Sequence, residues 1–89
     1  MRVRVKVVCV PHPREEIERA LRTAGKRLTS RADSVSVEVR EGERLTAVLE
    51  FEMRGAAQYK VVDQIWNEVK FWTQDFREDI SVRFPKDRA

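Results

Sequence analysis

Two hydrophobic periodicities alternate along this chain, and their order predicts the fold. From Arg2 to Val7, charged residues alternate with valines, which is typical of a strand with one buried and one solvated face, and the strand is expected to run to about Val10. In the second half of the chain, apolar residues recur at the three- and four-residue spacing of an amphipathic helix: Val61, Val62, Ile65, Val69, Trp72 and Phe76. Both patterns recur, giving the order strand, helix, strand, strand, helix, strand.

The first helix is expected to run from Pro13 to Leu28. Proline suits the first helical position, and Pro11 ends the preceding strand because it cannot extend a hydrogen-bonded ladder. Gly25 lies within this helix, where glycine costs about 1 kcal/mol relative to alanine, but Leu28 keeps the helical phase. The apolar stripe of the helix contains Ile17, Ala20, Leu21, Ala24 and Leu28.

A hairpin is predicted next. Valines alternate from Ser34 to Arg40, and the following strand spans Leu45 to Met53. A tight turn is therefore expected at Glu41-Gly42-Glu43, with the glycine at a positive φ. Residues 54–56 separate the hairpin from the second helix, which is expected to end near Phe76.

A last strand, Ile80 to Phe84, completes two strand-helix-strand units around the central hairpin. This order predicts an α+β fold, a two-layer ferredoxin-like βαββαβ sandwich. Its antiparallel four-stranded sheet has the order 4-1-3-2 and carries both helices on one face. Residues 1–85 are expected to form a single domain, and residues 86–89 a frayed tail.

The single cysteine, Cys9, excludes an internal disulfide framework and favours a reducing compartment. The longest apolar run near the N-terminus, Val7 to Val10, is too short for a signal peptide or a membrane span. We therefore expect a cytoplasmic protein with no membrane partner.

The outward face of the predicted sheet is charged. Arg2, Arg4 and Lys6 of the first strand are expected to lie opposite Glu50 and Glu52 of the third. RNA-recognition-motif proteins share this order of elements, but they stack bases on aromatic residues of their central strands. The first fifty residues contain no Phe, Trp or Tyr, so RNA binding on the sheet face is not expected.

Two pairs of residues carry groups that catalysis or metal binding uses. Glu50 and Glu52 lie two residues apart on one face, which could suit paired-carboxylate hydrolysis, but no cleft is predicted around them. Cys9 and His12 have a C-x-x-H spacing, but zinc requires three or four protein ligands, and the chain has no other cysteine or histidine. We expect no catalytic residue, no cofactor and no metal within one chain, and no enzyme activity; a metal site shared between two copies stays open.

Charge is unevenly distributed. Residues 1–33 contain nine Lys and Arg against four Asp and Glu, and the remainder contains nine against eleven. In the predicted topology the end of the first helix and the start of the second lie at the same end of the domain, where free backbone N–H groups favour an anion. One predicted function is therefore binding of an anion or a nucleic-acid backbone at Arg27, Arg31, Arg54, Lys60 and the N–H groups of Ala56 and Ala57.

Aromatic residues of the second helix predict a different function. Tyr59 and Trp66 fall on one flank of the apolar stripe, and Phe71 lies on the far side among polar residues. An exposed phenylalanine together with an open sheet edge at the second strand favours self-association or a protein partner. Our main expectation is a small, non-catalytic interaction or regulatory module that acts through protein–protein contacts, as in a homodimer, at Phe71, Trp66 and Tyr59.

Overall fold

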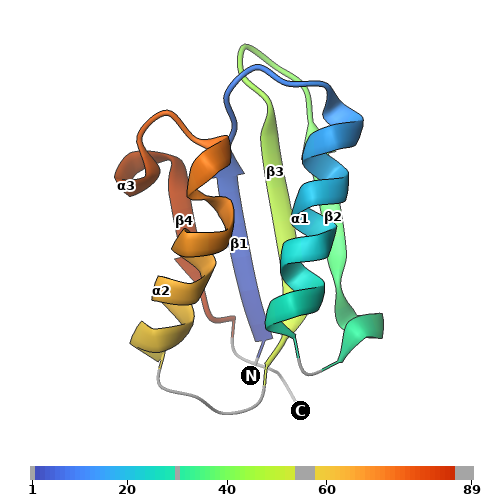
Figure 1. Cartoon of the computed structure of the whole chain (residues 1–89), viewed down its shortest axis with the longest axis vertical. Helices are drawn as coiled ribbons and strands as arrows, with labels where there is room; N and C mark the ends of the chain where they lie inside the picture. The colour runs from blue at the N-terminus through green and yellow to red at the C-terminus, as the bar shows by residue number, and fades with distance from the viewer. Residues whose placement is uncertain (1, 30, 54–57, 86–89) are drawn as a thin grey trace.

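The computed structural model describes residues 2–29, 31–53 and 58–85, so the expected tail at residues 86–89 lies outside the described part of the chain. Figure 1 shows how the elements follow one another. In chain order they are β1 (Arg2–Val8), α1 (Arg14–Leu28), the 3-10 helix η1 (Ala32–Ser34), β2 (Ser36–Arg40), β3 (Thr46–Glu52), α2 (Gln58–Val69), the 3-10 helix η2 (Lys70–Trp72), α3 (Phe76–Asp79) and β4 (Ile80–Arg83).

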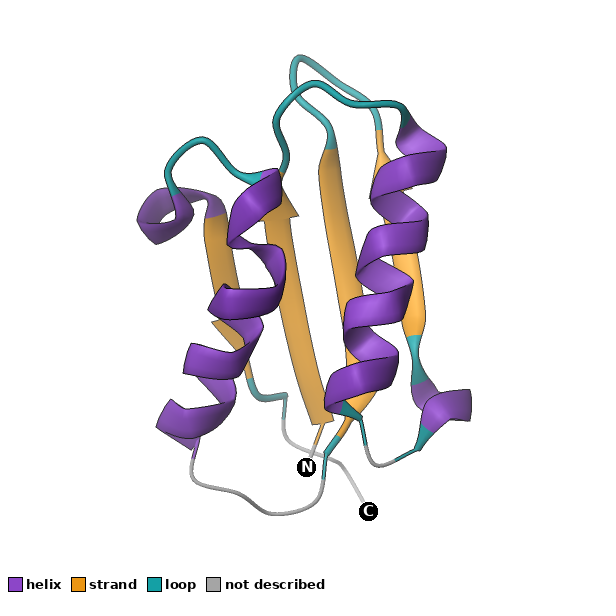
Figure 2. Ribbon diagram, in the orientation of Figure 1, coloured by secondary structure: helices purple, strands orange, loops and turns teal. Residues whose placement is uncertain are grey.

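The four strands form one sheet in the order β2-β3-β1-β4, and each neighbouring pair is antiparallel. This is the predicted order read from the opposite edge. Figures 1 and 2 show that α1 and α2 lie across the same face of the sheet, α1 over β2 and β3, and α2 over β1 and β4. The predicted α+β architecture and strand order are confirmed.

The core lies between the sheet and the helices. Val3, Val5 and Val7 are completely buried because alternate residues of a strand point to the same face. Cys9 continues this alternation and is 1 % exposed, so the interpretation of the cysteine as a small core residue is correct. The other buried apolar residues are Ile17, Leu21, Ala24, Val39, Ala47, Leu49, Phe51, Val61, Ile65, Val69 and Ile80.

The second helix ends earlier than predicted. Regular α-helix stops at Val69, and the chain continues through η2 into α3, which begins after an N-cap formed by the Asp75 side chain. The carbonyl of Trp72 accepts a hydrogen bond from the N–H of Val10 at 2.7 Å, which ties this break to the end of β1. Trp72 and Phe76 still pack against the core, so the apolar spacing continues although the helix does not.

The turn between β2 and β3 also differs from the prediction. It spans residues 41–45, and Gly42 has no positive φ. The longer loop reverses the chain without a left-handed residue, and its last carbonyl, that of Leu45, accepts the N–H of Cys9 at 2.8 Å. The Arg44 guanidinium forms an ion pair with Asp79 at 3.4 Å. These two contacts fix the loop to β1 and to α3.

Candidate interaction surfaces

The edge strand β4 adjoins an apolar surface. This strand pairs only with β1 among the described strands, so its other side is an unpaired sheet edge. One side of α2 lies above it and carries Tyr59, Val62 and Trp66. Val62 and Trp66 share the side of Tyr59 because they follow it by three and seven residues, about one and two helical turns. We call the surface at this edge the β4 flank, and its half-buried or exposed members are Tyr59, Val62, Trp66, Phe76, Val82 and Phe84.

The centre of the β4 flank is a packed pair of rings. Trp66 meets Phe76 edge-to-face with 5.5 Å between ring centroids, and the Arg77 guanidinium lies 5.8 Å from the Phe76 ring. A shallow hollow of about 360 Å³ adjoins this pair. The indole N–H of Trp66 is buried and has no hydrogen-bond acceptor within the described part of the chain. Packing alone therefore holds this ring.

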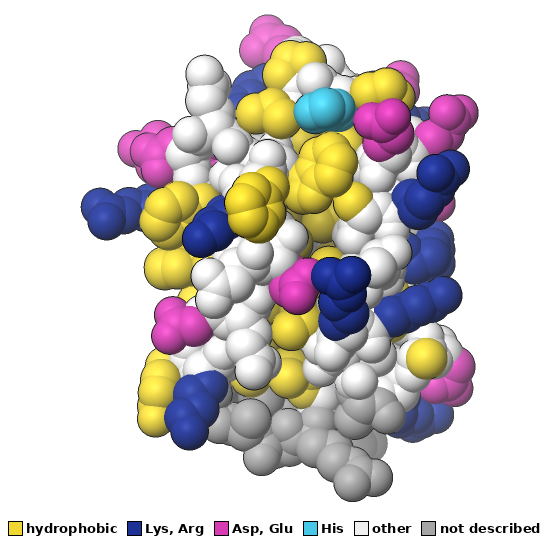
Figure 3. All heavy atoms as spheres, viewed as in Figure 1, with side chains coloured by type: hydrophobic (Ala, Val, Ile, Leu, Met, Phe, Trp, Pro, Cys, Tyr) yellow, Lys and Arg dark blue, Asp and Glu magenta, His cyan; other side chains and the backbone are white. Residues whose placement is uncertain are grey.

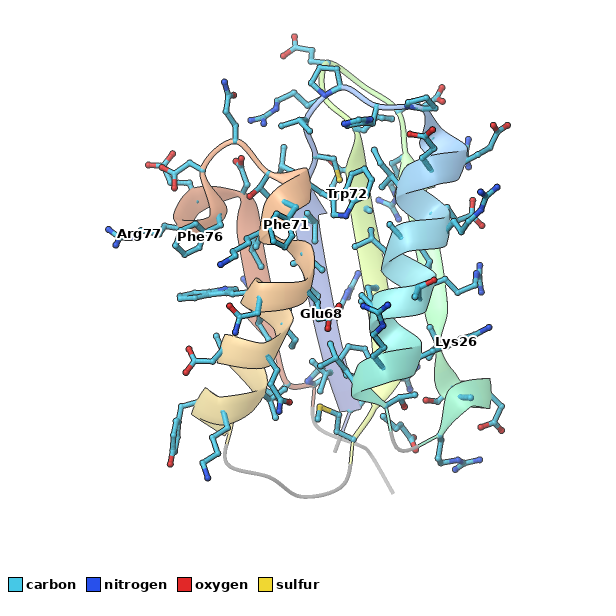
Figure 4. The ribbon with its side chains drawn as sticks, viewed as in Figure 1. Lys26, Glu68, Phe71, Trp72, Phe76 and Arg77 are labelled. Atoms are coloured by element: carbon cyan, nitrogen blue, oxygen red, sulfur yellow. The ribbon has the colours of Figure 1, made fainter. Side chains whose placement is uncertain are left out.

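The three predicted interaction residues lie on two surfaces, as the helical spacing indicated. Tyr59 belongs to the β4 flank and is 68 % exposed, whereas Phe71 is 76 % exposed on η2 beside Lys70. In Figure 4, Phe71 and Phe76 point in different directions, and Phe71 lies nearer the side of α2 that carries Glu68 and faces α1. Phe76, which packs against Trp66, was predicted as a residue of the apolar stripe and not as an interaction residue.

The opposite sheet edge has a different character. On β2, Glu38 and Arg40 form an ion pair at 3.1 Å, and Lys26 of α1 projects outward on this side of the molecule (Figure 4). Figure 3 shows Lys and Arg side chains along the α1 side, whereas hydrophobic side chains appear on the α2 and α3 side and between the helices. Charged residues beside an edge oppose strand pairing with another chain. The β4 strand also carries a charged residue, Arg83, but it adjoins the apolar β4 flank, so β4 is the edge better suited to pairing.

The predicted anion site is only partly within the described residues. Arg27 forms an ion pair with Glu68 at 3.4 Å, and Arg31 forms pairs with Asp33 at 3.4 Å and with Glu52 at 3.6 Å. Lys60 is exposed. The other predicted members, Arg54, Ala56 and Ala57, lie outside the described residues. Anion binding at the start of α2 stays a prediction.

The open face of the sheet is the one turned away from the helices. The register places Arg2 opposite Glu52 and Arg4 opposite Glu50, as predicted, whereas Lys6 lies opposite Val48. Glu50 forms ion pairs with both Arg2, at 3.2 Å, and Arg4, at 3.4 Å. Because both arginine side chains are about half-exposed, each pair contributes little to stability. Glu50 and Glu52 face cations here, as the sequence indicated.

Cys9 and His12 do not form a reactive pair. Burial raises the pKa of the Cys9 thiol from 9.0 to about 11, while the nearby Arg44 lowers it and Asp79 raises it. His12 packs edge-to-face on Trp72 with 5.1 Å between ring centroids and lies 3.6 Å from a Glu16 carboxylate oxygen. In residues 2–29, 31–53 and 58–85, no three His, Cys, Asp or Glu side chains cluster in a way that could hold a metal ion.

Comparison with known proteins adds no assignment: no family model, no curated protein and no solved structure matches this chain. Among the described helices, none is long and apolar enough to cross a bilayer. The candidate function therefore rests on the surfaces themselves.

Proposed function

We propose that this chain is a small, non-catalytic interaction module that associates with a second copy of itself through the β4 edge. The observation that carries the proposal is the β4 flank, where an unpaired strand edge lies beside the Trp66–Phe76 ring pair and the exposed Tyr59. An unpaired edge offers main-chain hydrogen bonds to an added strand, and adjacent apolar side chains supply buried area.

A second copy fits this edge for geometric and electrostatic reasons. Two copies of β4 can pair antiparallel about a two-fold axis, so that the same residues contribute from each side. The two α2 helices then run in opposite directions across the axis. The N-terminal end of one α2 carries the exposed Lys60. It faces the α3 of the other copy, which carries the exposed Glu78. Glu78 can then meet Lys60 at both ends of the interface, whereas Arg77 of the same α3 lies over the Phe76 ring.

Size adds a further argument. A domain of 89 residues buries a smaller share of its surface than a larger one does, so burial against a second chain contributes proportionally more to its stability. Among large hydrophobic residues, only Tyr59 and Phe71 are exposed in the described part of the chain. Tyr59 lies on the proposed interface and Phe71 does not, which provides a matched pair for the test.

The test is sedimentation over a concentration series for the wild type, Tyr59→Glu and Phe71→Glu. Both substitutions replace an exposed aromatic side chain with the same charge, so neither is expected to disturb the core. We expect the wild type and Phe71→Glu to dimerise with similar affinity, and Tyr59→Glu to dimerise at least about tenfold more weakly. A wild type that stays monomeric, or a dimer lost in Phe71→Glu and retained in Tyr59→Glu, would contradict the proposal.

A further inference from the structure

Two arginines lie directly opposite each other on the open face of the sheet. In the antiparallel pairing of β1 with β4, Arg4 is the partner of Arg83, and on the next outward rung Lys6 is the partner of Ser81. Residues directly opposite in such a pair have Cβ atoms about 5 Å apart, and like charges in these positions are destabilising. The fold therefore places repulsion where a pair of opposite charges would stabilise it.

The carboxylates of this face offset the charge of Arg4 only in part. Glu38, Glu50 and Glu52 belong to β2 and β3, where Glu38 pairs with Arg40, Glu52 pairs with Arg31, and Glu50 is shared by Arg2 and Arg4. Neither Lys6 nor Arg83 forms an ion pair with any residue that the structure describes. The β1–β4 half of the face thus carries positive charge without a matching acid on its strands.

These side chains surround a hollow. Arg4, Lys6, Ser81 and Arg83 line a concave surface of about 490 Å³, with Glu78 and Asp79 at one end of it. Asp79 is already bound by Arg44 and by the N–H groups of Gln74 and Asp75. Glu78 is exposed on α3, beyond the strand, and the three cations that line the hollow outnumber its two acids.

We propose that this hollow is a binding site for a phosphate group. Two guanidinium groups can donate paired hydrogen bonds to phosphate oxygens, the Lys6 ammonium adds a third cation, and the Ser81 hydroxyl adds a neutral donor. A bound phosphate places negative charge between Arg4 and Arg83 and removes their repulsion. The site requires the side chains of one copy only, so its test does not depend on the proposed dimer.

The binding test uses calorimetric titration with pyrophosphate at low ionic strength. Lys6→Gln and Arg83→Gln each remove one cation from the hollow, and Lys26→Gln and Arg19→Gln remove the same charges from exposed positions on α1, in the other layer. We expect Lys6→Gln and Arg83→Gln to bind at least about tenfold more weakly, and both α1 variants to bind like the wild type. No binding by the wild type, or equal weakening in all four variants, would overturn the proposal.

Thermal unfolding without phosphate provides a second readout that a merely structural arginine would not give. Relief of the Arg4–Arg83 repulsion should raise the Tm of Arg83→Gln by about 1–5 °C above that of the wild type. Phosphate should raise the Tm of the wild type more than chloride does at equal ionic strength, and it should not do so for Arg83→Gln. A lower Tm for Arg83→Gln, together with unchanged pyrophosphate binding, would overturn the proposal.

Competition distinguishes the sources of the phosphate. If a short single-stranded oligonucleotide displaces pyrophosphate from the wild type, the phosphate belongs to a nucleic-acid backbone. If a small phosphate ester competes and the oligonucleotide does not, the ligand is a free phosphorylated molecule. Both outcomes support the site, because displacement requires the shared hollow, and failure of both competitors would overturn it.

Discussion

Gly25 on α1 lies so close to Leu49 on β3 that a Cβ atom at the glycine would be 2.9 Å from Leu49 Cδ1. The same atom would lie 2.9 Å from Val35 Cγ1. Both neighbours belong to the packed interior, so they cannot move aside freely. This contact explains why a residue with poor helix propensity occurs inside a 15-residue helix.

Gly25→Ala should therefore destabilise the fold. Overpacking of this kind typically costs about 1–3 kcal/mol, and the better helix propensity of alanine offsets about 1 kcal/mol of it. Urea unfolding measures the difference, with Lys26→Ala as the control at the next, exposed position of α1. A Gly25→Ala protein as stable as the control would show that α1 does not pack this closely on the sheet.

Trp66 provides a test of the β4 flank within one chain. Trp66→Phe keeps an aromatic ring against Phe76 and removes the indole N–H that lacks an acceptor, so it should change the free energy of unfolding by less than about 1 kcal/mol. Trp66→Ala loses the ring packing and should cost about 3 kcal/mol. Chemical denaturation measures the free energy of unfolding of both variants. Equal losses in Trp66→Phe and Trp66→Ala would indicate that the indole N–H of Trp66 has a hydrogen-bond partner.

Cys9 should be protected from thiol reagents in the folded protein. Its pKa of about 11, raised by burial, lowers the thiolate fraction near pH 8 by about a hundredfold relative to a free thiol. Labelling by a disulfide reagent should be slow in buffer and fast in denaturant. Rapid labelling under native conditions would place the thiol outside the core.

The same shift of the Cys9 pKa predicts a dependence of stability on pH. The folded state retains the proton that the unfolded state releases, so the contribution is fully present below pH 9 and is lost as the pH rises towards 11. Cys9→Ala should lack this part of the alkaline decline. Identical alkaline profiles for the two proteins would contradict it.

Asp79 should stabilise the link between the β2–β3 loop and α3. Its pKa lies below the ordinary value of 3.8, chiefly because the N–H groups of Asp75 and Gln74 bind its carboxylate, with Arg44 adding to the effect. Asp79→Ala should lose about 1 kcal/mol of stability at neutral pH. This contribution to stability is present at pH values above the pKa of Asp79 in the unfolded state. It is lost as the pH falls through the lower pKa of Asp79 in the folded state.

The Asp79→Ala variant and the wild type should therefore converge in acid. Urea midpoints measured from neutral pH to about pH 2 test this, because protonation of the Asp79 carboxylate in acid removes its contribution to the stability of the wild type. Glu78→Ala, at the neighbouring exposed position, is the control. A constant difference at all pH values would mean that the Asp79 charge has no part in the link.

The sequence predicts the strand faces well and the registers less well. The alternation of Val3, Val5 and Val7 assigns one face to the core, and their burial follows from it. A shift of two residues keeps every side chain on the same face, so alternation alone does not define which residue lies opposite which. The opposition of Arg4 and Arg83 depends on the register of the four-residue strand β4, which the hydrophobic pattern does not indicate.

The interaction surface was predictable only in part. Helical spacing placed Tyr59 and Trp66 on one flank of α2. The same spacing, extended beyond Val69, also suggested a continuous helix to Phe76, because apolar residues that reach the core from η2 and α3 mimic the period. The chain turns there, and Phe76 returns against Trp66. Local breaks of this kind depend on contacts such as that between Val10 and Trp72, which lie far apart in the sequence.

The most direct test of self-association through β4 is residue-resolved amide hydrogen exchange at low and high protein concentration. Amides of Ile80–Arg83 that do not bond to β1 should become more protected as concentration rises, because they acquire acceptors in the second copy. Amides at the opposite edge, in Ser36–Arg40, should exchange equally at both concentrations. Exchange from β4 that does not change with concentration, or protection that rises only at β2, would contradict the account.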